Sequence, residues 1–311
     1  MKKITQTIYH SLLETVSAGA ILLLAPGALA QNLFVSDWRT GTIYKDTSGG
    51  VQSTFATGFS NLAGLAFDSA GDLFAVDQGV GKAYEFIDNS GTLSSTPTLI
   101  DSGLNTPAGL AFDSAGDLFI ANAGGNDIIE IAHGGGISTY ATGLNYPLGL
   151  AFNTLGDLFV ANSGNGTITK ITPGKVQSTY ASGLSQPWGL AFNNIGDLFV
   201  GNLNGQIPGQ GSITKITPGK VQTTFVSGLT IPNELAFNST GDLLVAEGQS
   251  SDVLEFTSTG ASGPTINITG AQNVNGLAFQ DVALPVPEPS ALALMSIGGV
   301  VILGRRFRKY G

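Results

Sequence analysis

The 311-residue chain has no cysteine, only two histidines and only 11% charged residues. The absence of cysteine excludes disulfide bonds and thiolate metal sites. The histidines are His10, close to the N-terminus, and His133, in a glycine-rich stretch. No nucleophile and base are visible around either of them, which argues against the common hydrolase triads. The low charge also argues against long solvated helices, whereas the 44 glycines and the many apolar residues favour short strands joined by turns.

Basic residues are concentrated at the two ends of the chain. Residues 31–284 contain 7 Lys and Arg but 20 Asp and Glu, so this part is acidic. An acidic surface without a basic patch repels phosphate backbones, and nucleic acid is therefore not an expected partner.

The N-terminal segment, residues 1–30, has the pattern of a secretory signal peptide. Lys2 and Lys3 precede a short apolar run, and Ala28-Leu29-Ala30 provides a signal-peptidase site before Gln31. An uncleaved membrane anchor is the alternative.

The C-terminal segment, residues 285–311, combines a Pro287-Glu288-Pro289 motif, an apolar stretch and a basic tail that starts at Arg305. This order resembles the PEP-CTERM sorting signal. The resemblance implies transient anchoring of a transmembrane helix in the inner membrane, cleavage by an exosortase, and delivery to the cell surface or matrix of a Gram-negative bacterium. The basic tail independently predicts a cytoplasmic C-terminus, which leaves the rest of the chain outside. An ordinary C-terminal anchor is the alternative.

The middle of the chain, residues 31–284, is a repeat. Gly-Leu-Ala-Phe occurs five times and Glu234-Leu235-Ala236-Phe237 is a sixth, variant copy, with the final Phe residues 45, 40, 40, 45 and 42 positions apart. Residues 149–181 contain four short β-patterned segments separated by turn residues, as in one blade of a β-propeller.

The chain ends predict how the ring closes. Residues 33–56 supply the second, third and fourth strands of a blade, and residues 276–279 form an unpaired first strand. Their pairing predicts an all-β, six-bladed propeller; an open solenoid is the alternative. The repeat resembles NHL repeats and the six-bladed (TolB-like) propellers that include gluconolactonases and virginiamycin B lyase.

Two rings of residues are expected at one mouth of the central channel, and one side of them is rich in oxygen. We predict Asp37, Asp77, Glu234 and Glu247 as ligands of Ca²⁺ or another divalent cation. We predict Trp188, Asn233 and Asn275 as ligand-binding residues. Asp and Asn at strand ends also cap the following turns by local hydrogen bonds, and this structural role is the alternative.

The resemblance to gluconolactonases implies a Glu, Asn and Asp metal site in the channel mouth. Asn233 and Asn275 stand where two of these ligands would lie, but no Asp occupies that position. The sequence therefore favours a non-catalytic surface or matrix protein that binds a polysaccharide or a surface protein, with no certain cofactor. A metal-dependent hydrolase or lactonase and a purely structural matrix component are the alternatives.

Overall fold

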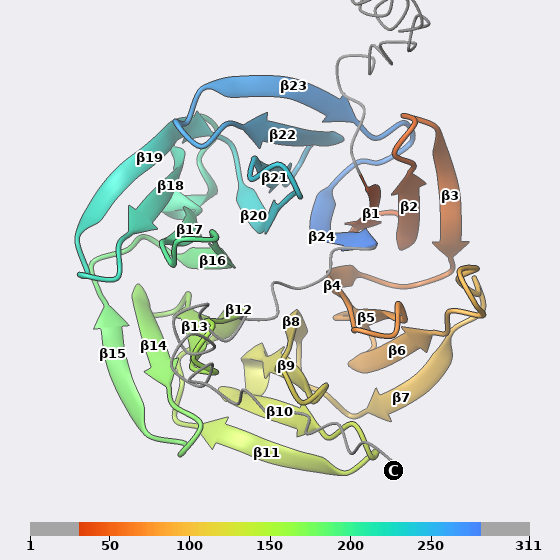
Figure 1. Cartoon of the computed structure of the whole chain (residues 1–311), viewed down its shortest axis with the longest axis horizontal. Helices are drawn as coiled ribbons and strands as arrows, with labels where there is room; N and C mark the ends of the chain where they lie inside the picture. The colour runs from red at the N-terminus through yellow and green to blue at the C-terminus, as the bar shows by residue number, and fades with distance from the viewer. Residues whose placement is uncertain (1–30, 281–311) are drawn as a thin grey trace, which may run out of the picture.

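The computed structural model describes residues 31–280, and these residues form six four-stranded antiparallel sheets arranged as a ring (Figure 1). The predicted six-bladed propeller is confirmed. The predicted signal peptide, the sorting motif and the C-terminal helix lie outside the described residues. Within residues 31–280, no helix is long and apolar enough to cross a membrane.

The closing blade contains both ends of the described chain, as predicted. Its strand order is β24-β1-β2-β3, and Leu33, Phe34 and Val35 of β1 pair with Phe279, Ala278 and Leu277 of β24. The strands are β1 (Asn32–Asp37), β2 (Thr42–Asp46), β3 (Gln52–Thr57) and β24 (Val274–Gln280).

The other five blades follow one another along the chain, each from the innermost strand to the outermost. Blade one consists of β4 (Leu62–Phe67), β5 (Leu73–Asp77), β6 (Lys82–Phe86) and β7 (Thr98–Ser102). Blade two consists of β8 (Pro107–Phe112), β9 (Leu118–Asn122), β10 (Asp127–Ile131) and β11 (Ile137–Thr142). Blade three consists of β12 (Pro147–Phe152), β13 (Leu158–Asn162), β14 (Thr167–Ile171) and β15 (Gln177–Ala181).

Blade four consists of β16 (Pro187–Phe192), β17 (Leu198–Asn202), β18 (Gly211–Ile216) and β19 (Gln222–Leu229). Blade five consists of β20 (Pro232–Phe237), β21 (Leu243–Glu247), β22 (Asp252–Phe256) and β23 (Ser262–Asn267). In residues 31–280 the helical segments are two short 3₁₀ turns, η1 (Ala123–Gly125) and η2 (Asn204–Gln206).

The repeated phenylalanines form the contacts between blades. The last Phe of a Gly-Leu-Ala-Phe motif packs edge-on against the Phe in the second strand of the preceding blade. Examples are Phe119 with Phe152 and Phe159 with Phe192, whose ring centroids are 4.9 and 5.0 Å apart. Such pairs add about 0.5–1.5 kcal/mol to the effect of burial.

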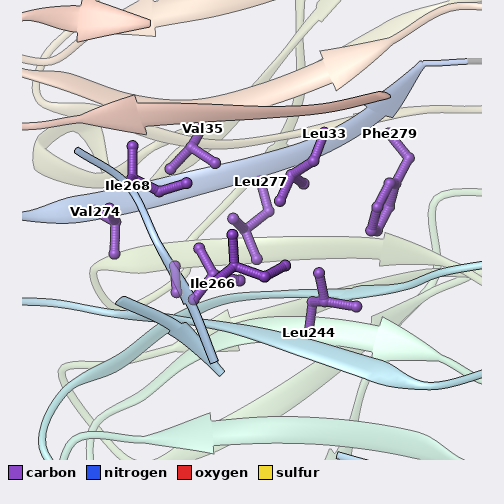
Figure 2. Packing of buried hydrophobic residues seen from close by; sticks show 10 residues of the cluster. Leu33, Val35, Leu244, Ile266, Ile268, Val274, Leu277 and Phe279 are labelled. Carbon is purple, nitrogen blue, oxygen red and sulfur yellow. The ribbon is translucent and has the colours of Figure 1, made fainter. Parts of the chain in front are cut away.

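Blade five departs from this pattern because Leu244 occupies the position of the Phe. Leu244 and Phe279 belong to one buried cluster between blade five and the closing blade (Figure 2). Leu33, Val35 and Ile266 are further members of this cluster. The interface between blade five and the closing blade is therefore apolar, and residues of both β1 and β24 contribute to it.

The motif glycine is required where the inner strands approach the channel axis. A Cβ atom on Gly149 would lie 2.1 Å from the carbonyl oxygen of Trp188 in the next blade. The equivalent glycines of four other blades meet the neighbouring inner strand in the same way. Blade five differs at this position, because it has Glu234 in place of the glycine.

Candidate functional site at the channel mouth

The second strand of each blade ends in a buried polar residue next to the channel mouth. Asp77 accepts hydrogen bonds from the backbone N–H groups of Ser60, Asn61 and Gly79, at 2.8–3.1 Å. Its two carboxylate oxygens are thus directed into the connection that leads to β4. This geometry is the turn-capping role that the sequence had left open.

Asp37 has the same role at the closing blade. One carboxylate oxygen accepts from the N–H groups of Arg39 and Thr40, at 2.8 and 2.9 Å, and the other accepts from Gln272 and Asn273. The carboxylate therefore joins the start of the propeller to the connection that precedes β24. In residues 31–280, no three His, Cys, Asp or Glu residues come together in a group that could hold a metal ion.

Blade five has two buried oxygens without a hydrogen-bond partner at the channel mouth. Glu247 Oε2 accepts the N–H of Thr230 at 2.7 Å, but Oε1 accepts nothing. Asn233 donates through Nδ2 to the carbonyl oxygen of Val274 at 3.4 Å, and its Oδ1 is also unpartnered. Burial raises the pKa of Glu247, opposed by hydrogen bonds from Thr230 and from the backbone of Ile231.

Glu234 is the one charged residue on the six innermost strands of the described chain. It retains partial contact with solvent although protein surrounds it. Burial raises the pKa of Glu234 to about 8, against the opposing effect of a hydrogen bond from the Leu235 N–H. Near neutral pH this carboxyl group is therefore largely protonated and can donate a hydrogen bond.

The predicted site residues are thus only partly brought together. Asn233, Glu234 and Glu247 belong to the two inner strands of blade five, and the buried Asn275 lies on β24 of the neighbouring blade. Asp37 and Asp77 instead accept hydrogen bonds from the backbone of the turn that follows each of them and of the connection that precedes the inner strand beside it. Ca²⁺ or another divalent cation at these residues stays a prediction.

Trp188, a predicted ligand-binding residue, lies in an apolar cluster. Trp188 is half-buried and packs on a small cluster formed by Ala108, Ala123 and Leu148. That Trp188 binds a ligand stays a prediction. His133 is exposed between β10 and β11, and its backbone N–H donates to Asp117 Oδ1 at 2.8 Å.

A concavity on blade four was not predicted from the sequence. It lies beside Asn202, the end of β17, and includes residues of β18 and β19. One signal was available: the connection between β17 and β18, residues 203–210, is longer than its counterpart in blade three, residues 163–166. Insertions in repeat proteins often map to a binding face.

Two family models match parts of the chain. The PEP-CTERM protein-sorting motif matches residues 285–309, and the NHL repeat matches residues 144–171. The chain carries an NHL repeat and a PEP-CTERM motif. The PEP-CTERM motif implies that the protein is exported, and the NHL match coincides with the strands β12, β13 and β14 of blade three. No curated protein matches the sequence.

Several solved structures share the fold at low sequence identity. A chain of a nidogen/laminin complex is 18% identical, with a TM-score of 0.69, and the match covers 80% of this chain and 98% of that one. Virginiamycin B lyase from Staphylococcus aureus, solved with quinupristin, is 18% identical, with a TM-score of 0.61 and coverage of 80% and 88%. A protein thought to be a gluconolactonase is 16% identical, with a TM-score of 0.59 and coverage of 71% and 82%. These proteins include enzymes and a component of a protein complex. The structural similarity therefore supports the fold alone and no particular activity.

Proposed function

We propose that the PEP-CTERM propeller is an exported, non-catalytic binding platform on the surface or in the extracellular matrix of a Gram-negative bacterium. Signal peptidase would cleave the chain before Gln31, and the C-terminal segment would then hold the protein in the inner membrane. An exosortase would finally cleave the chain near Pro287-Glu288-Pro289. The sorting motif supports this route. The partner would be a polysaccharide or another surface protein.

One observation carries the non-catalytic part of the proposal. The carboxylates of Asp37 and Asp77 each accept several hydrogen bonds from backbone N–H groups of the adjacent loops. A carboxylate saturated in this way stabilises the loop and is poorly placed to ligate a metal or to transfer a proton. A rigid ring with capped loops instead suits a surface that presents fixed binding groups.

The test is retention of the purified protein on extracellular matrix from a strain that lacks its gene. Retention that saturates, without turnover of lactone or ester substrates in the presence of Ca²⁺ or Mg²⁺, is expected. Absence of retention on this matrix and on isolated cell-surface polysaccharide would contradict the platform.

A metal-dependent hydrolase or lactonase is the second candidate, favoured by the unpartnered oxygens of Asn233 and Glu247 in one blade. Titration calorimetry with Ca²⁺ and Mg²⁺ separates the two candidates. Metal binding that is lost in Glu247→Gln, accompanied by metal-dependent turnover, would favour the enzyme. Heat of binding without turnover would leave a structural cation in the platform.

A further inference from the structure

A polar cleft of about 280 Å³ lies on blade four, away from the channel axis. Its walls are the connection from blade three, residues 183–185, and strands β17, β18 and β19. The end of β15 and the start of β19 meet beside this connection at the left rim of Figure 1, where Gln222 Nε2 donates to the carbonyl oxygen of Ser182 at 3.3 Å. The volume is close to the lower limit of about 300 Å³ for small-molecule pockets.

Asn202 lines this cleft and carries a buried oxygen without a hydrogen-bond partner. The side chain is only 3% exposed, and its Nδ2 donates to Thr214 Oγ1 at 3.0 Å and to the carbonyl oxygen of Val200 at 3.2 Å. Its Oδ1 accepts no hydrogen bond. Because both bonds of Nδ2 would be disturbed by exchanging the two amide atoms, the oxygen is fixed where it is. A buried acceptor without a partner is unfavourable, because it has lost its hydrogen bonds to water.

The equivalent asparagine oxygens of blades two and three, on Asn122 and Asn162, are satisfied. Asn162 Oδ1 accepts the N–H of Asn145 at 3.1 Å, and Asn145 lies 17 positions earlier in the chain. In blade four the residue 17 positions before Asn202 is Ser185, which also lines the cleft. Since Asn202 Oδ1 has no partner, the Ser185 N–H does not reach it. Blade four thus presents an acceptor and, in the connection opposite, the amide donor that satisfies this acceptor elsewhere.

We propose that this cleft binds one residue of a neutral sugar, whose hydroxyl group donates to Asn202 Oδ1 and accepts from the Ser185 N–H. A hydroxyl group does both at once, whereas an ammonium group only donates and a carboxylate only accepts. The side chains of Asn204, Ser212 and Thr224 add further uncharged polar groups. The lining contains no charged residue, which matches a neutral ligand rather than an acidic one.

This inference deepens the proposed platform by naming the site and the ligand class. A free sugar and a residue within a polysaccharide offer the same hydroxyl groups. The experiment therefore uses monosaccharides as probes for the cleft and the matrix-retention assay for the polymer.

The first measurement follows the Ser185 amide by ¹H–¹⁵N NMR on the full chain, kept in a detergent without a sugar headgroup. The probes are glucose, galactose, mannose and N-acetylglucosamine. We expect at least one of them to shift the Ser185 amide signal in a saturable way, with a dissociation constant of about 1 mM.

The second measurement uses a pair of matched variants. Thr224→Tyr places a ring in the cleft from the exposed face of β19 and should weaken sugar binding at least tenfold. Thr179→Tyr makes the same change in blade three, since Thr179 pairs with Thr169 as Thr224 pairs with Thr214, and it should leave binding unchanged. Asn202→Leu should also weaken binding at least tenfold, with folding checked by the melting temperature.

The outcomes distinguish this proposal from the platform. If no probe shifts the Ser185 amide signal, or if Thr224→Tyr binds the probes with the affinity of the natural chain, the cleft holds water only and the inference is wrong. Matrix retention that persists under those results leaves the platform standing. Sugar binding in the cleft without retention on the matrix or on isolated cell-surface polysaccharide supports the cleft and contradicts the platform.

Discussion

Replacement of Glu234 by Gln should change how the stability of the propeller depends on pH. The pKa of Glu234 is raised from 4.5 to about 8, mainly by burial. Between these values the folded protein holds a proton that the unfolded chain releases. The free energy of unfolding therefore falls as the pH rises from about 4.5 to about 8, and levels off above that.

The magnitude follows from the size of the shift. Each pKa unit corresponds to about 1.4 kcal/mol, so the shift sets an upper limit of about 5 kcal/mol. Glu234 retains partial contact with solvent, which screens its charge. We therefore expect at least about 2 kcal/mol at pH 8 relative to pH 5, still a large fraction of the stability of a typical domain.

The assay is reversible urea unfolding of the natural chain and of Glu234→Gln at pH 5 and pH 8, with EDTA present to remove divalent cations. Glutamine has nearly the same shape but does not titrate. Other carboxyl groups with raised pKa values, such as Glu85 and Glu255, contribute equally to both proteins and cancel in the difference. Glu234→Gly, which restores the glycine of the other blades, should resemble Glu234→Gln at pH 8.

Two results would refute the reasoning. One is a stability difference between the natural chain and Glu234→Gln that is the same at both pH values. The other is a carboxyl ¹³C titration in which the signal missing from Glu234→Gln has its midpoint near 4.5 rather than near 8.

Three further changes test the capped loops, the inner ring and the closure. Asp77→Ala leaves three loop N–H groups without their acceptor and should cost about 2–4 kcal/mol in urea unfolding; a loss below about 0.5 kcal/mol would contradict the capping role. Gly149→Ala should destabilise by at least about 2 kcal/mol, because its Cβ would meet the Trp188 carbonyl oxygen at 2.1 Å, whereas Gly174→Ala, in an open turn, serves as the control. Leu277→Ala removes a buried side chain from the interface between blade five and the closing blade, and it should lower the free energy of unfolding by about 2–5 kcal/mol. A melting temperature equal to that of the natural chain would show that this interface contributes little to stability.

The ring could be predicted from the sequence because the residues that form the contacts between blades belong to short repeated motifs. The Phe of Gly-Leu-Ala-Phe and the Phe of the second strand meet across every interface except the one where Leu244 stands. A first strand at residues 276–279, without a following blade, could only pair with the incomplete blade at the start. Such pairing depends on strand count and hydrophobic pattern, and both are visible in the sequence.

The hydrogen-bond partners of the polar residues at the channel mouth depend on the tertiary structure. The sequence predicts Asp37 and Asp77 as cation ligands, but it does not show which backbone N–H groups approach their carboxylates. Asn162 and Asn202 stand at equivalent positions in the repeat, yet one oxygen is satisfied and the other is not. That difference depends on the exact position of a loop relative to a strand end, because hydrogen bonds weaken steeply outside a narrow range of distance and angle. The sequence by itself determined the ring, and only the folded chain determined which of its polar groups remain available to a ligand.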